Sequence, residues 1–117
     1  MSIHCMQINA QRSSKALLEI QSLTQFAQSS ILFVQEPTII GQRPFNLKGW
    51  RRYCHESPAR ASLYTSLDLI ATPHSLTSRD AAVVLVETPT GPLLAASVYC
   101  DINLSFRNDL QPEIFDS

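Results

Sequence analysis

The sequence predicts an α/β fold built around a mixed β-sheet. One observation is a strand, a helix and a second strand within about 36 residues, the size of a βαβ unit with parallel strands. A series of short strand candidates follows, and a clear β-hairpin lies between residues 81 and 99. Because hairpin strands run antiparallel, the sheet should contain both strand directions, with the helix on one face.

The βαβ unit is predicted over residues 3–34. Residues 3–11 alternate roughly between apolar and polar and indicate the first strand. Ser13 or Ser14 can cap a helix that runs to about Gln28. The apolar positions of this helix fall at helical spacing: Leu17, Ile20, Leu23 and Ala27. The continuous apolar run ILFV, residues 31–34, is typical of a strand buried on both faces.

The middle of the chain is less regular. Two prolines and two glycines interrupt residues 37–49, which we expect to form a loop. Three short strand candidates follow, at residues 50–54, 61–64 and 67–71. The pattern therefore predicts antiparallel strands after the βαβ unit. It supplies little to cover the face of the sheet opposite the helix.

The hairpin is the clearest signal in the second half. Residues 81–87 and 93–99 are rich in β-forming residues, and the phrase TPTGP between them marks a chain reversal. After Asp101 the pattern dissolves, and residues 108–115 indicate the start of a helix.

The amino-acid composition indicates a folded domain but does not indicate a function. The chain has 117 residues, 44% of them hydrophobic and 16% charged, which predicts a single folded domain over residues 1–117. Its formal net charge of −1 shows no basic excess of the kind found in nucleic-acid coat proteins. An enzyme acting on phosphates needs only a local basic strip, so the net charge does not exclude one.

The cysteines and the N-terminus predict an intracellular protein. The three cysteines include no C-x-x-C pair, so neither a zinc site nor a redox dithiol is indicated. The first residues lack the features of a secretory signal. The apolar runs are far shorter than the roughly 20 residues that cross a bilayer. We expect no membrane association, no secretion and a location in the nucleus or cytoplasm.

Four phrases carry a resemblance to a known family: INAQRSSKALLEI, ILFVQEP, PARASLY and SLTSRDAAVVLVETPTGPLLAASVYCDIN. In this order and spacing they resemble the endonuclease domain of non-LTR (LINE-type) retrotransposons, in the endonuclease/exonuclease/phosphatase superfamily. The resemblance extends to about Asn103. It implies the N-terminal part of a deoxyribonuclease I-like, four-layer α/β sandwich with two packed mixed β-sheets. It also implies phosphodiester hydrolysis at one end of the sandwich with a divalent metal, usually Mg²⁺.

Glu36 is the first candidate site residue. It ends the buried strand run ILFVQ, immediately before Pro37, which prevents easy continuation of a strand. Ligands of α/β folds bind at the carboxyl ends of strands, and Mg²⁺ usually takes one or two carboxylates. Spacing alone favours the alternative, an ordinary exposed glutamate at a strand end. The resemblance implies that Glu36 occupies the catalytic metal-ligand position.

Asn9 and Tyr99 are the other two candidate catalytic residues. Asn9 ends the first strand, and if the first two strands are parallel neighbours it emerges beside Glu36. The alternative for Asn9 is a turn-forming asparagine. Tyr99, in the phrase SVYCD, matches a family tyrosine whose hydroxyl reaches the scissile phosphate. The alternative for Tyr99 is a core aromatic residue.

Two arginines are weaker candidates for contact with nucleic acid. Arg12 follows Asn9 and could approach a DNA backbone, although a solvated helix start explains it equally. Arg79 precedes Asp80 in a phrase typical of the retrotransposon branch. We expect a local Arg79–Asp80 pair that steadies the start of a strand, and phosphate contact by Arg79 is the alternative.

The family's remaining catalytic phrases are absent from the sequence. Neither a Gly-Asp-Phe-Asn-like nor a Ser-Asp-His-like phrase occurs, so the resemblance implies a truncated domain. We expect weak Mg²⁺ binding through Glu36, and no appreciable nuclease activity unless a missing part completes the DNA site.

Two other functions stay open. The chain could be a non-catalytic interaction module that pairs with another chain through an exposed sheet face. It could also be a phosphatase or phosphodiesterase for small molecules, although that would need a second metal-binding carboxylate that the sequence does not offer.

Overall fold

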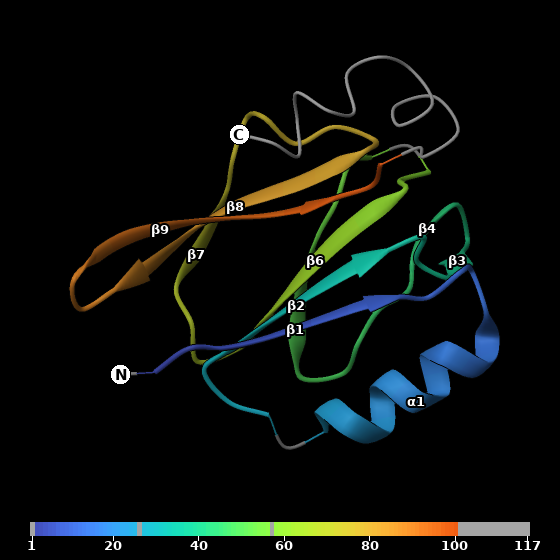
Figure 1. Cartoon of the computed structure of the whole chain (residues 1–117), viewed down its shortest axis with the longest axis horizontal. Helices are drawn as coiled ribbons and strands as arrows, with labels where there is room; N and C mark the ends of the chain where they lie inside the picture. Colours follow the sequence, from blue (N-terminus) through green and yellow to red (C-terminus); the bar gives the residue numbers. More distant parts are fainter. Residues whose placement is uncertain (1, 26, 57, 101–117) are drawn as a thin grey trace, which may run out of the picture.

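The computed structural model describes residues 2–25, 27–56 and 58–100. It contains one helix and two main β-sheets (Figure 1). The first sheet has the strand order β1 (His4–Asn9), β2 (Ser30–Gln35), β6 (Ala61–Ser66) and β5 (Trp50–Tyr53). The second has the order β7 (Ala71–Pro73), β8 (Ala81–Thr88) and β9 (Gly91–Val98).

The predicted βαβ unit is confirmed. Strands β1 and β2 are parallel, with Asn9 beside Gln35, and α1 (Ser14–Thr24) connects them. The apolar run of β2 is buried on both faces, as its sequence predicts, because the helix covers one face and the second sheet covers the other. Strands β6 and β5 continue the sheet in antiparallel pairing, so this sheet is mixed.

Helix α1 begins where predicted and ends four residues early. The Ser13 hydroxyl accepts hydrogen bonds from the backbone N–H groups of Lys15 and Ala16, at 3.2 and 3.4 Å. At the other end, the Trp50 indole donates to the Thr24 carbonyl at 3.3 Å, which satisfies a carbonyl that a longer helix would have used. Leu23, predicted to face the core, is 77% exposed.

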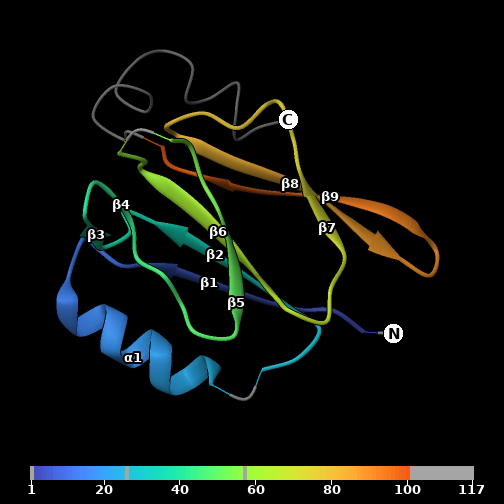
Figure 2. The same cartoon turned by 180° about the vertical axis from the view of Figure 1, so that it is seen from behind.

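The second sheet covers the face of the first sheet opposite α1 (Figure 2). The expectation that little would cover this face was therefore wrong, because the hairpin β8–β9 forms a separate sheet and does not extend the first one. Within the described residues the layers are helix, sheet and sheet. One apolar core lies between α1 and the first sheet, and another lies between the two sheets.

Two local predictions need correction. The predicted loop 37–49 contains a small hairpin of β3 (Ile39–Ile40) and β4 (Arg43–Pro44). The strand predicted at residues 67–71 is instead a turn, closed by a Leu69 N–H to Ser66 carbonyl hydrogen bond of 3.1 Å, and strand β7 starts only at Ala71.

The hairpin is confirmed, with a tighter reversal than the phrase TPTGP indicates. Strands β8 and β9 pair from Ala81–Val98 to Thr88–Gly91, leaving a two-residue turn. Gly91 adopts a φ of 126°, which a residue with a side chain rarely adopts. The helix predicted over residues 108–115 lies outside the described residues. Over the described part of the chain, no helix is long and apolar enough to cross a membrane.

Candidate active site at the shared end of the two sheets

Glu36 lies directly after β2, in a backbone conformation that is rare for its residue type. Its φ is 47°, in the left-handed region, and its side chain is half-buried. The Glu36 N–H donates to the Arg60 carbonyl at 2.9 Å, and its carbonyl accepts from the Arg12 N–H at 2.8 Å. Backbone contacts on both sides therefore hold the reversal that begins at Pro37.

Asn9 emerges at the same end of the first sheet, as the parallel pairing predicts. Its Oδ1 accepts a hydrogen bond from the Gln11 N–H at 3.0 Å, which forms an Asx turn. Gln11 and Arg12 have φ values of 50° and 57°. The turn-forming role considered for Asn9 is thus present in the structure. It also fixes the direction of the exposed amide at the mouth of the sheet.

Tyr99 reaches the same end from the second sheet. It follows β9, and its backbone N–H donates to the Asp80 carbonyl at 2.7 Å. A pocket at this end brings Tyr99 and Asn9 together, and its lining is completed by Gln7, Ile8, Gln35, Val98 and Cys100. Glu36 adjoins this pocket through its neighbour Gln35 without being among the lining residues.

Arg60 is a residue of this region that sequence reasoning missed. It stands directly before β6, and its guanidinium makes two contacts with the Asp80 carboxylate, Nε–Oδ1 at 2.6 Å and Nη2–Oδ2 at 3.2 Å. The guanidinium carbon also lies 5.1 Å from the centre of the Tyr99 ring. The only sequence signal for Arg60 is its place in the phrase PARASLY.

The two arginines predicted to contact nucleic acid lie at this end and are exposed. Arg12 is held next to Glu36 by the backbone contact described above. The expected Arg79–Asp80 pair is not formed, because Asp80 pairs with Arg60. The Nε of Arg79 instead donates to the Pro58 carbonyl at 3.3 Å, and its own carbonyl accepts from the Arg60 N–H at 2.6 Å.

The donor chemistry at this end fits Mg²⁺ only in part. Among residues 2–25, 27–56 and 58–100, no group of three or more His, Cys, Asp or Glu side chains could hold a metal ion. Glu36 would contribute a single carboxylate, the lower end of what Mg²⁺ usually takes from proteins. The expectation of weak binding follows from this donor set.

Among the cysteines, Cys54 is a poor candidate for a competing nucleophile. Cys5, Cys54 and Cys100 are free thiols. Burial raises the pKa of Cys54, although the nearby cations of Arg52 and Arg43 act in the opposite direction. A raised pKa leaves the Cys54 thiol protonated at neutral pH, and a protonated thiol is a poor nucleophile.

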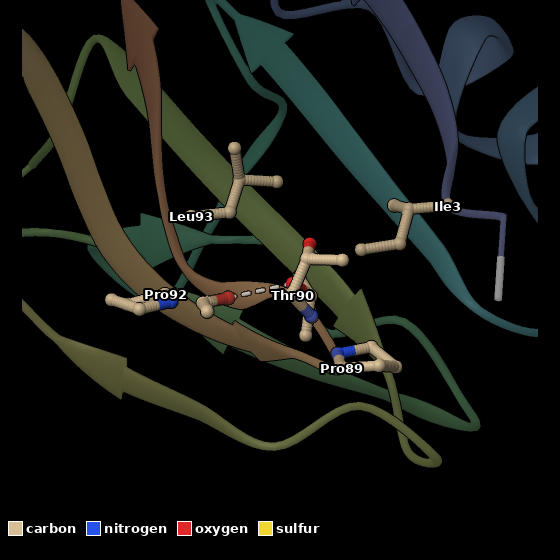
Figure 3. Close-up of a pocket in the computed structure, with 7 residues that line it drawn as sticks. Ile3, Pro89, Thr90, Pro92 and Leu93 are labelled. Carbon is tan, nitrogen blue, oxygen red and sulfur yellow. Dashed lines mark hydrogen bonds between the residues drawn. The ribbon is translucent and has the colours of Figure 1, made fainter.

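The opposite end of the strands carries a second cavity with different chemistry (Figure 3). Its lining consists of Ile3 and the hairpin segment of residues 88–93. The Thr88 hydroxyl donates to the Gly91 carbonyl at 2.6 Å. This end is thus closed by its own turn and presents mainly proline, threonine and leucine side chains.

Comparisons with known proteins identify the fold. No family model and no curated protein matches the sequence. A solved structure that does match is the endonuclease domain of TRAS1, a telomere-specific non-LTR retrotransposon, with a TM-score of 0.66 and 21% sequence identity. The match covers 97% of this chain and 52% of that domain's chain. The chain therefore has the fold of about half of a non-LTR retrotransposon endonuclease domain, as the four sequence phrases predict.

Proposed function

We propose that this chain is part of a magnesium-dependent DNA endonuclease of the retrotransposon type, which hydrolyses a phosphodiester bond. The observation that carries the proposal is the meeting of Asn9 and Tyr99, from two different sheets, around one pocket beside Glu36. The fold shared with the TRAS1 endonuclease domain supports it. In this proposal a complete domain is a four-layer sandwich, and the described layers are three of the four.

Each residue has a distinct role in the proposed reaction. The Glu36 carboxylate would hold Mg²⁺, which supplies positive charge to the phosphate when bound. The Asn9 amide would donate to a phosphate oxygen or orient a metal ligand, and the Tyr99 hydroxyl would donate to the scissile phosphate. Arg12 and Arg79 are exposed at the same end and would contact the DNA backbone.

The chain alone should lack appreciable nuclease activity. Phosphodiester cleavage needs several groups that act together on the water, the phosphorus and the leaving oxygen, and such groups fail together. The family's aspartate–asparagine and aspartate–histidine phrases are absent from the sequence. Nicking of supercoiled DNA by the chain with Mg²⁺, abolished by Glu36→Ala, would contradict this statement.

A Mg²⁺ titration followed by amide NMR tests the metal site directly. We expect millimolar Mg²⁺ to shift the amide resonances around Gln35 and Glu36, with Glu36→Gln removing the response. Glu19→Gln is the matched control, since Glu19 is an exposed carboxylate on α1. A response that persists in Glu36→Gln, or that is equally sensitive to Glu19→Gln, excludes Glu36 as the ligand.

A second candidate function is a non-catalytic interaction module. Within the described residues, β1 and β5 are the outer strands of the first sheet, and β7 and β9 are those of the second; each pairs on one side only. Large apolar side chains are exposed on β9, namely Leu93 at 41%, Leu94 at 53% and Val98 at 54%. Unpaired strand edges with apolar side chains favour pairing with another chain.

Sedimentation analysis separates this candidate from the first. We expect concentration-dependent association of the chain, reduced by Val98→Lys because a charge on an edge strand opposes strand pairing. Leu23→Lys, at an exposed position of α1, is the matched control and should leave association unchanged. A strictly monomeric chain over the accessible concentration range would contradict the interaction module.

A further inference from the structure

We propose that Arg60 is the positioning residue of the site, and that it holds Tyr99 in place through a shared contact with Asp80. This inference rests on the proposed function, because Arg60 would act only by positioning Tyr99, whose catalytic role is itself proposed. It assigns to Arg60 no contact with substrate or metal. Three observations carry it: the paired contact with Asp80, the position of the guanidinium on the Tyr99 ring, and the backbone contacts of Arg60.

The paired contact fixes the plane of the guanidinium. Nε and Nη2 of Arg60 face the two carboxylate oxygens of Asp80, at 2.6 and 3.2 Å. The Nη2 contact is a hydrogen bond and the Nε contact is an ion-pair contact, and together they restrict the orientation of the planar group more than either would alone. The side chains of Arg60 and Asp80 are 34% and 47% exposed, but the two atoms of their closest contact, Nε and Oδ1, are buried.

The guanidinium of Arg60 also lies over the aromatic ring of Tyr99, one of the proposed catalytic residues. Its central carbon is 5.1 Å from the centre of the Tyr99 ring, within the range of a cation–π contact. Asp80 also accepts the backbone N–H of Tyr99 at 2.7 Å. One aspartate therefore holds Tyr99 by its backbone and, through Arg60, by its ring. These contacts restrict the orientation of the Tyr99 ring at the pocket that Tyr99 and Asn9 both line.

The backbone of Arg60 extends the same unit to the proposed metal ligand. Its carbonyl accepts the Glu36 N–H at 2.9 Å, and its N–H donates to the Arg79 carbonyl at 2.6 Å. Segments that are distant in sequence are thus joined around one residue: the ends of β2 and β9, and the starts of β6 and β8. Arg60 has a direct contact with both Glu36 and Tyr99, whereas Asp80 contacts Tyr99 and Arg60.

The chemistry of arginine explains why lysine would not serve. A lysine ammonium keeps the positive charge but has no planar fork for two carboxylate oxygens, and it does not stack on a ring as a guanidinium does. If Arg60 were only one half of a stabilising ion pair, Arg60→Lys would leave the Tyr99 ring where it is. If Arg60 positions the ring, the same substitution releases it.

Fluorine NMR of the full chain labelled with 3-fluorotyrosine distinguishes these two roles. The chain has three tyrosines, Tyr53, Tyr64 and Tyr99, and single Tyr→Phe variants assign their resonances. We expect Arg60→Lys to shift and broaden the Tyr99 resonance, with those of Tyr53 and Tyr64 unmoved. Asp80→Asn should reproduce the effect. Arg51→Lys, at an exposed arginine of β5, is the matched control and should move none of the three.

The outcomes separate this inference from the proposed function. A Tyr99 resonance that stays sharp and in place in Arg60→Lys, recorded well below the melting temperature, overturns the positioning role even if stability falls. Shifts of all three resonances indicate loss of the fold, and Arg60→Lys is then replaced by Asp80→Asn, whose unchanged Tyr99 resonance would also overturn the role. Loss of the Mg²⁺ response at Glu36 is measured independently and bears on the proposed function alone.

Discussion

Two carboxylates at opposite ends of the strands show how differently the chain uses the same chemical group. Asp68, in the turn after β6, accepts three contacts from Ser29, the residue before β2: two from its N–H and one from its hydroxyl, at 2.8–3.0 Å. Hydrogen bonds from the hydroxyl of Ser66 and from Ser29 lower the pKa of Asp68 to about 2. Glu36, directly after β2, contacts Arg60 and Arg12 through its backbone N–H and carbonyl.

The two carboxylates therefore differ in how much of their hydrogen-bonding capacity the fold itself uses. Both carboxylate oxygens of Asp68 accept hydrogen bonds from Ser29, so this carboxylate stabilises the fold itself. No described residue donates a hydrogen bond to the Glu36 carboxylate, although the backbone around it is fixed and has a positive φ. A residue whose backbone is held in a costly conformation while its carboxylate is left uncommitted is typical of a functional position.

The largest change in the free energy of unfolding should come from a substitution in β6, the strand that runs between the two ends. Leu63 lies in the middle of β6, is fully buried and packs in the core between the two sheets. Leu63→Ala should lower the free energy of unfolding by about 2–5 kcal/mol. Chemical denaturation should lose both ends in one transition. Separate transitions for the two ends would break the comparison, because the ends would then belong to independent units.

A smaller effect is expected at the cap that adjoins the site end. The Ser13 hydroxyl caps α1, and the Ser13 carbonyl accepts the Thr38 hydroxyl at 2.7 Å. Ser13→Ala should cost about 1 kcal/mol of unfolding free energy. Ser14→Ala is the control, since it removes a neighbouring hydroxyl that does not cap the helix. Equal losses in the two variants in thermal melts would contradict the capping role.

The two carboxylates should differ in how their effects depend on pH. The folded-state pKa of Asp68, about 2, lies below its ordinary value of 3.8, so its stabilisation is present above pH 4 and is lost as the pH falls toward 2. Asp68→Asn should lower the melting temperature by a few degrees at pH 7 and flatten its pH dependence between pH 4 and 2. Melting temperatures of the two proteins that stay equally far apart at pH 2 would contradict this.

The smallest effect is expected for the uncommitted carboxylate. Glu36→Gln keeps the backbone contacts and should change the unfolding free energy by no more than about 0.5 kcal/mol at neutral pH. Measuring Glu36→Gln and Asp68→Asn in the same denaturation series compares directly how much each carboxylate contributes to stability. A loss in Glu36→Gln larger than that in Asp68→Asn would show that Glu36 has a structural role.

Sequence alone predicts the parts of this fold that local residues decide. The run ILFV identifies β2, Ser13 identifies the helix start, and residues 81–99 identify the hairpin, because each signal lies within a few residues of the structure it specifies. The prediction for Leu23 was wrong because the buried side of α1 passes through Ile20 and Thr24, and the Thr24 hydroxyl satisfies itself there by donating to the Ile20 carbonyl. The separate second sheet depends on packing between distant segments, so only the family resemblance indicated two packed sheets.

The residues of the candidate site also fall into those that the sequence predicts and those that it does not. Asn9, Glu36 and Tyr99 could be named because each stands at the end of a recognisable strand and matches a family phrase. Arg60 could not be named, because its partner Asp80 is 20 residues away and its ring contact is with Tyr99 on another sheet. Nothing in the local sequence around Arg60 distinguishes it from Arg79, whose predicted pairing with Asp80 was wrong.

The hydrogen bond from Trp50 to the end of α1 gives the molecule an internal optical reporter. Trp50 is the only tryptophan of the sequence, and its indole contacts the outer layer of the fold while its backbone belongs to the first sheet. Its fluorescence should therefore follow the docking of the helix, whereas the amide I infrared band of β-strands follows the two sheets. If emission changes before the strand signal during denaturation, α1 detaches as a unit while the two sheets remain packed.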